Sequence, residues 1–171
     1  MPIDIQTPQI SSEESPREIL SADFKSLGGA LPIKGGWGYT LEDAVVIDKN
    51  DSVASKVPFN GIGYEYIFVE KRIYEELIIF RPEDERHSGI KWNLLKQKLV
   101  KHNDRRYDVL TFEVTALPDK DWEELKTEWK GINRDNSPEF DVDAHMKKKN
   151  TLTIRYVTDY WFDITSFYGS K

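Results

Sequence analysis

The sequence predicts an α+β domain in which two or three helices pack against a mostly antiparallel sheet. Segments with strand character outnumber those with helical character, and the two kinds do not alternate regularly along the chain. Regular alternation would instead indicate a doubly wound parallel sheet. The 171 residues are enough for one domain with a sizeable core. We therefore expect a flexible N-terminal tail over residues 1–14 and a single globular domain over residues 15–171.

The first helix is predicted from its capping residues. Ser15 is followed by Pro16 and Glu18, which is the pattern of an N-cap, a proline at the first helical position and a capping box. The glycines at 28–29 are expected to end this helix, because glycine readily adopts the left-handed conformation found after a helix.

A second helix is predicted from Asp121, a suitable N-cap, to Gly131. Trp122, Leu125 and Trp129 share one face of this helix. Such a stripe usually packs inside a protein, so we expect it to face the core. The same stripe would form an interface if the sheet had no room for it.

Four segments indicate strands. Residues 44–47 are apolar and β-branched, which is typical of a central strand. Residues 109–116 alternate between apolar and polar side chains, as a half-buried strand does. Residues 90–100 favour a strand over a helix. Residues 151–167 indicate either one long strand or two strands that meet at Asp159.

Residues 62–80 are compatible with both periods. Tyr64, Tyr66 and Phe68 alternate with their neighbours as in a strand, whereas the apolar residues that follow also recur at helical spacing. We favour a strand through Val69.

A glycine-rich stretch lies just ahead of the strand at 44–47. Lys34 precedes Gly35, and no serine or threonine follows in the register of a phosphate-binding loop. The spacing also fails the dinucleotide-binding pattern. The stretch therefore indicates a tight turn or bulge. The alternative is a binding loop that exposes Trp37 and Tyr39.

A short acidic segment offers the one candidate metal site. Its potential ligands occupy alternate positions: Glu139, Asp141, Asp143 and His145. In an extended segment these side chains would point the same way and could hold a divalent cation. The segment lacks the glycine and distal glutamate of a calcium loop, so an acidic solvated loop is the alternative interpretation.

The bulk composition excludes several classes of function. The chain has no cysteine, which excludes disulfides, thiolate nucleophiles and zinc–thiolate sites. The first residues lack the features of a secretory signal, and no apolar run approaches the roughly 20 residues that span a bilayer. We therefore expect a soluble, cytoplasmic protein without a membrane partner.

The charge pattern favours a protein partner. The net charge of −6 disfavours nucleic-acid binding, although basic residues and aromatics gather at 91–106. An acidic run at 119–143 could meet a basic protein and steer its association. His87, His102 and His145 lie in polar stretches without catalytic spacing, and each is expected to be an exposed loop residue.

These observations predict a non-catalytic protein-interaction domain without a cofactor. It would be an inhibitor or immunity-type protein that binds a basic partner through Trp37, Tyr39, Glu123 and Glu124. The alternative is a small ligand- or metal-binding domain, or an enzyme, whose site is built from dispersed residues and leaves no motif.

Overall fold

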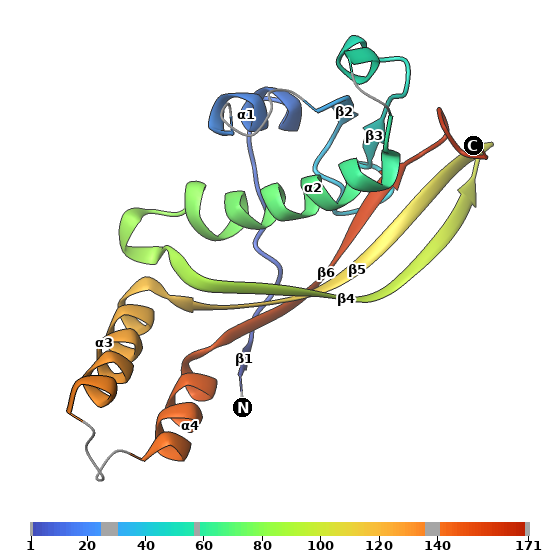
Figure 1. The fold of residues 1–171 in the computed structure, drawn as a ribbon. Helices are drawn as coiled ribbons and strands as arrows, with labels where there is room; N and C mark the ends of the chain where they lie inside the picture. The colour runs from blue at the N-terminus through green and yellow to red at the C-terminus, as the bar shows by residue number, and fades with distance from the viewer. Residues whose placement is uncertain (1, 25–30, 57–58, 136–140, 170–171) are drawn as a thin grey trace.

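The computed structural model describes residues 2–24, 31–56, 59–135 and 141–169. Within these ranges six strands form one open sheet in the order β2–β3–β6–β5–β4, with β1 beside β6 (Figure 1). β1 and β3 run parallel to β6, and the other pairs are antiparallel. The strands are β1 (Ile3–Asp4), β2 (Ile33–Gly35), β3 (Val45–Ile47), β4 (His87–His102), β5 (Arg105–Pro118) and β6 (Ile154–Asp163). The predicted α+β class with a mostly antiparallel sheet is confirmed.

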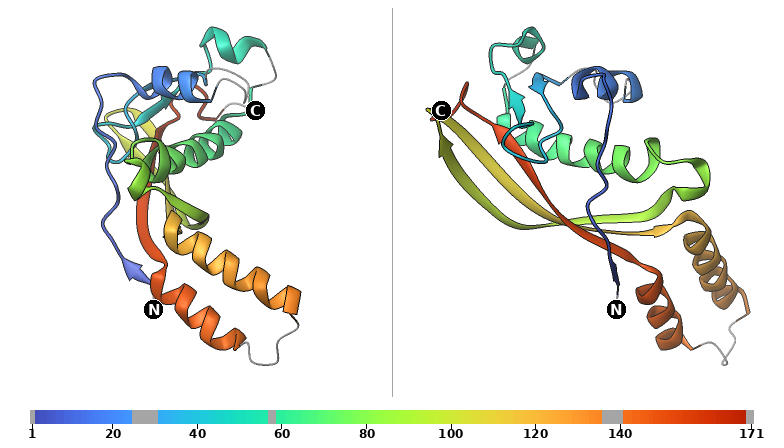
Figure 2. Two further views of the ribbon diagram at one scale, coloured as in Figure 1. Left: turned by 90° about the vertical axis from the view of Figure 1, so that its left-hand side faces the viewer. Right: turned by 180° about the vertical axis from the view of Figure 1, so that it is seen from behind.

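Four α-helices accompany the sheet within the described ranges, and short 3-10 helices occur at Ser52–Lys56 and Glu83–Glu85. α2 lies across the concave face of the sheet and α1 lies beyond it, whereas α3 and α4 project together from one end (Figure 1). Figure 2 shows that none of the described helices crosses the middle of the opposite face of the sheet. The α-helices are α1 (Pro16–Asp23), α2 (Gly61–Tyr74), α3 (Asp119–Asp135) and α4 (Val142–Leu152).

The start of α1 confirms the predicted capping box. The hydroxyl oxygen of Ser15 accepts a hydrogen bond from the backbone N–H of Glu18 at 3.3 Å. The Glu18 carboxylate in turn accepts one from the backbone N–H of Ser15 at 3.4 Å. Both donors would otherwise lack an intrahelical partner. The glycines at 28–29, predicted to end this helix, lie outside the described residues.

The strand predicted through Val69 is wrong, because the segment from residue 61 forms α2. Asn60 caps this helix by accepting from the N–H of Gly63 at 3.0 Å. Phe68, Val69 and Ile73 then fall at helical spacing and are fully buried against the sheet. The helix ends in a π-helical turn over Glu75–Ile79. Burial of one helical face therefore outweighs the alternation of aromatic residues.

The hydrophobic core lies between α2 and the concave face of the sheet. Phe68 packs edge-on against Phe162 of β6, with ring centroids 5.7 Å apart. Phe112 of β5 packs in the same way on Tyr160, at 5.5 Å. Edge-to-face packing is a favoured arrangement of buried aromatic rings. The core thus fastens α2 to the two central strands.

The strand predictions for β3, β4, β5 and β6 agree with the structure. The alternating segment at 109–116 lies inside β5, and residues 90–100 lie inside β4. β4 and β5 form a hairpin whose two turn residues, Asn103 and Asp104, both have positive φ angles of 48° and 63°. Such two-residue turns match the twist of an antiparallel pair. β6 is one strand and does not break at Asp159.

The N-terminal segment differs from the expected flexible tail. β1 pairs with β6, with Ile3 opposite Ile154. Further along, Ile10 is buried in the main core and its backbone N–H donates to the Tyr39 hydroxyl at 3.1 Å. Apolar residues and backbone pairing thus hold a segment whose polar composition suggested a tail.

Candidate functional site

The glycine-rich loop before β3 is structural in the described chain. Trp37 is only 6 % exposed and packs on Phe68 with ring centroids 6.0 Å apart. The expectation that Trp37 is exposed is therefore wrong. Gly35 has a φ of +87°, and a Cβ there would lie 2.5 Å from the backbone oxygen of Ala44. Only glycine fits that position, which favours the interpretation as a tight turn.

Tyr39, the second aromatic residue of this loop, also contacts other residues of the protein. Its hydroxyl lies 2.7 Å from Oε2 of Glu76 in the π-helical turn. Its ring covers the guanidinium of Arg72 at 4.0 Å, and Tyr160 covers the same group from β6 at 3.7 Å. Trp37 and Tyr39 thus tie the loop to α2, and neither forms the exposed contact surface that the sequence suggested.

The Arg72 guanidinium is fully buried and well provided with acceptors. It donates to Glu76 Oε2 at 3.2 Å and to Thr158 Oγ1 at 2.7 Å. It also donates to the backbone oxygens of Trp37 and Asp159, at 3.2 and 3.1 Å. A buried cation with this many partners positions the elements around it. We assign the group a structural role.

The predicted metal site assumed an extended segment, and this assumption is wrong because the segment forms the start of α4. Asp141 is its N-cap and accepts from the N–H of Ala144 at 3.1 Å. Asp143 is exposed in the first turn, whereas His145 is buried against α3. Glu139 lies outside the described residues. In the part of the chain that the structure describes, no three His, Asp or Glu side chains gather so that they could hold a metal ion.

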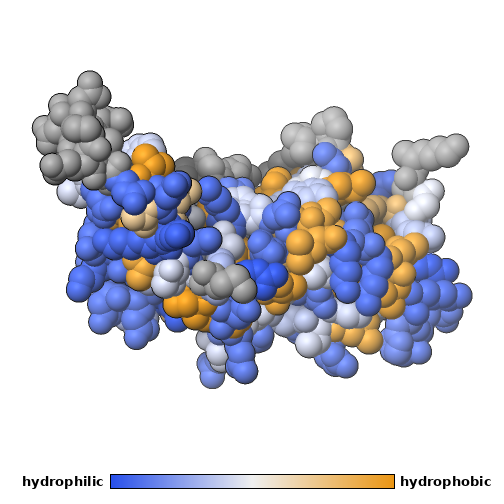
Figure 3. Space-filling model, turned by 90° about the horizontal axis from the view of Figure 1, so that it is seen from below, coloured by the Kyte–Doolittle hydropathy of each residue, from blue (hydrophilic) through white to orange (hydrophobic). Residues whose placement is uncertain are grey.

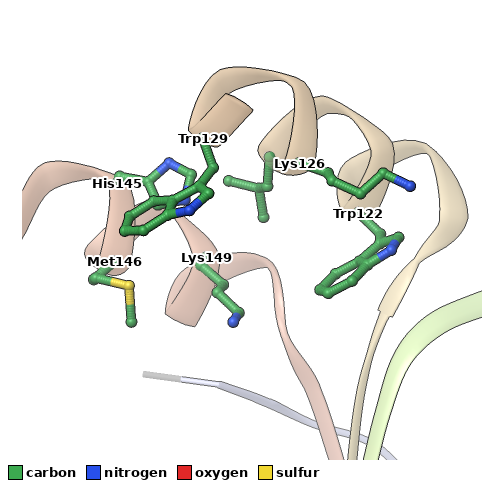
Figure 4. A pocket seen from close by; sticks show the side chains of 7 residues that line it. Trp122, Lys126, Trp129, His145, Met146 and Lys149 are labelled. Carbon is green, nitrogen blue, oxygen red and sulfur yellow. The ribbon is translucent and has the colours of Figure 1, made fainter. Parts of the chain in front are cut away.

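α3 and α4 enclose a groove of about 270 Å³ (Figure 4). Trp122 and Trp129 point from α3 into the space above α4, where Met146 and Lys149 face them (Figure 4). The two helices that line the groove lie at one end of the sheet, away from α2 (Figure 1). Its lining residues are Trp122, Leu125, Lys126, Trp129, His145, Met146 and Lys149.

The floor of the groove is buried and its walls are exposed. Leu125 is only 3 % exposed, whereas Trp129 is 45 % and Met146 49 % exposed. The Trp129 ring contacts the His145 ring, with centroids 5.5 Å apart. Figure 3 shows apolar surface on the underside of the molecule as separate patches among polar side chains. The predicted core stripe is therefore only partly a core, and Trp129 belongs to the surface.

Trp122 anchors α3 to the sheet. A Cβ at Gly89, near the start of β4, would lie 2.7 Å from the Trp122 ring, so the ring rests directly on that backbone. Lys149 of α4 also lies over this ring, with Nζ 5.9 Å from its centroid. Glycine at position 89 therefore lets the helix sit close to β4.

Three acidic side chains of α3, those of Glu123, Glu124 and Glu128, are not among the lining residues of the groove and form ion pairs. Glu123 binds Lys126 at 3.2 Å, and Glu124 binds Lys148 of α4 at 3.4 Å. Glu128 accepts from His145 at 3.0 Å, and this bond, with Lys148 nearby, holds the pKa of Glu128 below its usual range. The pairs of Glu124 and Glu128 join α3 to α4, whereas the Glu123–Lys126 pair lies within α3.

The charge inside the groove has the opposite sign. Lys126 and Lys149 line it, and none of the lining residues that the structure describes is acidic. Sequence reasoning missed Met146 and Lys149, because the acidic segment just before them suggested an extended metal-binding segment or a solvated loop and not a helix. The available signal was Asp141, which is a good N-cap three residues before Ala144.

None of the helices in the described ranges has the length and apolar character needed to cross a bilayer. Comparison with known proteins finds no matching family model, no matching curated protein and no matching solved structure.

Proposed function

We propose that this protein is a non-catalytic protein-interaction domain that binds a segment of its partner in the groove between α3 and α4. The observation that carries the proposal is the exposure of Trp129 and Met146, at 45 % and 49 %, on the two walls of this groove. Tryptophan and methionine are enriched at protein interfaces, and tryptophan is prominent among the residues that dominate binding energy.

The size of the groove suits one large apolar side chain. A volume of about 270 Å³ accommodates a tryptophan, phenylalanine or leucine side chain, with Leu125 as the apolar floor. Water leaving the apolar walls would favour such an occupant by about 25 cal/mol for each Å² of apolar surface buried.

The charge around the groove favours acidic residues next to that side chain. Lys149 offers one ammonium group, and Lys126 offers a second that it shares with Glu123 on the rim, whereas Glu124 is paired with Lys148. Complementary charge would fix the orientation of the segment and raise its association rate. The competing arrangement is the basic partner predicted from the net charge, which would contact Glu123 and Glu124 as an inhibitor or immunity-type protein could.

A peptide array distinguishes the two arrangements. One set carries a central Trp, Phe or Leu flanked by Asp and Glu, and the matched set has the same centre flanked by Lys and Arg. We expect the acidic set to bind, and Trp129→Ala to weaken binding at least about tenfold. Lys130→Ala, an exposed change on the same helix, should leave affinity unchanged.

Charge reversal provides the second arm of the experiment. The double variant Lys126→Glu with Lys149→Glu should shift preference from the acidic to the basic set. The proposal fails if no peptide of either set binds. It also fails if the basic set binds to the unaltered protein, is lost on Glu123→Lys or Glu124→Lys, and is indifferent to Trp129→Ala.

A further inference from the structure

A second cavity, of about 590 Å³, lies at the opposite end of the sheet from α3 and α4. It forms where the start of α2 meets β5 and the turn that follows β6 (Figure 1). Phe59, Ile164 and Phe167 contribute apolar walls, and Phe59 and Phe167 pack edge-on with centroids 5.1 Å apart. This cavity shares no lining residue with the α3–α4 groove.

Two acidic residues, Glu65 of α2 and Asp108 of β5, line this cavity. Glu65 is 1 % exposed and Asp108 is 7 % exposed. The Glu65 carboxyl hydrogen-bonds to Asp108, and Gln97 Nε2 donates to the two Asp108 oxygens at 3.0 and 2.8 Å. Gln97 holds the Asp108 carboxylate in place on β5, so the pair has a defined orientation.

The pair has no cation of its own within the described residues. None of the ion pairs formed there includes Glu65 or Asp108. Lys49 also lines the cavity, but its side chain is exposed. Burial, with the Asp108 carboxyl beside it, raises the pKa of Glu65 to about 9, so a proton is held between the two groups at neutral pH.

A positively charged ligand could replace that proton. It would then meet two desolvated carboxylates, which attract a cation more strongly than exposed ones do. The aromatic walls would cover an apolar group attached to the cation, and ring faces also attract organic cations. Nearby, the Tyr168 ring at the cavity edge already lies 5.3 Å from the Arg106 guanidinium.

We propose that this cavity binds an organic ammonium or guanidinium group that carries an apolar substituent, with Glu65 and Asp108 as its counterions. The inference is independent of the α3–α4 groove. The same chemistry could come from a small amine or from a lysine or arginine side chain of a protein.

Calorimetric titration and NMR test the proposal with phenethylammonium and benzylguanidinium, and with 2-phenylethanol as the neutral control. We expect the two cations to bind saturably at pH 8.5 and the alcohol to bind at least tenfold more weakly. Benzylguanidinium keeps its charge over the whole range, so its affinity should rise toward tenfold per pH unit between pH 7 and 9, as the Glu65 proton is displaced. Titration in two buffers of different ionisation enthalpy should show that proton being released.

The matched variants are Glu65→Gln and Glu70→Gln on the same helix. Glu65→Gln preserves the shape of the protonated group but removes its charge, so affinity should fall at least tenfold at pH 8.5 and the pH dependence should vanish. Glu70→Gln, away from the cavity, should bind as the unaltered protein does.

Lysine- and arginine-containing peptides distinguish the source. Peptides that compete with benzylguanidinium indicate a protein side chain as the occupant, and peptides that do not compete indicate a small molecule. The proposal is overturned if neither cation binds at pH 8.5, if the alcohol binds equally well, or if Glu65→Gln binds unchanged.

Discussion

Arg72 and Glu76 form a fully buried ion pair across one turn, with Nε and Oε2 3.2 Å apart. The pair joins three parts of the chain. Tyr39 from the glycine-rich loop and Tyr156 from β6 both place their hydroxyls on the Glu76 carboxylate, at 2.7 and 3.0 Å. The position of α2 on the sheet therefore depends on charge as well as on apolar burial.

Breaking this pair from one side should be costly. Glu76→Gln leaves the Arg72 cation buried without a counterion, and we expect the free energy of unfolding to fall by about 3–5 kcal/mol. Urea denaturation measures the change. Lys126→Gln, which breaks an exposed pair with Glu123, serves as the comparison and should cost no more than about 1 kcal/mol. Equal effects of the two substitutions would show that the buried network does not stabilise the fold.

Substitution by alanine should change the stability of the protein in opposite directions at two glycines. Gly35→Ala places a Cβ against the Ala44 backbone at a φ of +87°, so we expect a loss of about 1–3 kcal/mol. Gly131 lies exposed within α3, and nothing described lies within 4 Å of its added Cβ. Gly131→Ala should therefore gain about 0.5–1 kcal/mol. Thermal unfolding of both variants is the measurement, and a neutral Gly35→Ala would contradict the structural role of the loop.

Stability should fall as the pH rises above neutrality. Burial raises the pKa of Glu65 to about 9, with Asp108 beside it, and raises that of Glu75 to about 9, with Asp23 beside it. Both ordinarily titrate near 4.5, so between these values the folded chain holds protons that the unfolded chain has lost. This contribution is complete below about pH 4.5 and is lost toward pH 9, and we expect at least about 1 kcal/mol less stability at pH 8.5 than at pH 6.

Urea denaturation across that pH range tests the assignment. Glu65→Gln and Glu75→Gln should each flatten the decline, because the amide does not titrate. A decline that persists unchanged in both glutamine variants would contradict the assignment.

At acidic pH the stability should depend on a different group. The Arg17 guanidinium holds the pKa of Asp51 below its usual range, so the stability from that pair is lost only as the pH falls below about 4.

Leu125 and Trp129 should differ in what they contribute to folding. Leu125 is buried at the base of the groove, and Leu125→Ala should cost about 2–5 kcal/mol. Trp129 is 45 % exposed, so Trp129→Ala should cost less, about 1 kcal/mol, despite its larger side chain. Chemical denaturation compares the two variants. A loss at Trp129 as large as that at Leu125 would assign the stripe to the core and remove the basis for a docking groove.

Local signals predicted those elements that depend on neighbouring residues. Ser15 and Glu18 form the capping box within four positions of each other, and the alternation at 109–116 predicted a strand inside β5. The stripe of Trp122, Leu125 and Trp129 also lies on one helical face, as its spacing predicted. The sequence left open whether that face is buried or exposed, because this depends on the position of α3 at the end of the sheet.

The remaining features depend on residues far apart in the chain. Whether residues 61–74 form a helix or a strand is decided by the sheet face that buries Phe68 and Ile73, and the alternation of aromatic residues carries no information about that face. Trp37 is buried for the same reason, since its partner is Phe68 on α2.

The candidate sites also depend on residues that are far apart in the chain. Glu65 and Asp108 are 43 positions apart (108 minus 65), and neither has a motif around it. The sequence by itself determined the fold class, the capped start of α1 and the strand character of β3 to β6, because capping and periodicity act over a few residues. Only the tertiary structure decided which charges are paired and which aromatic residues stay exposed, because burial and charge pairing depend on elements that meet in space.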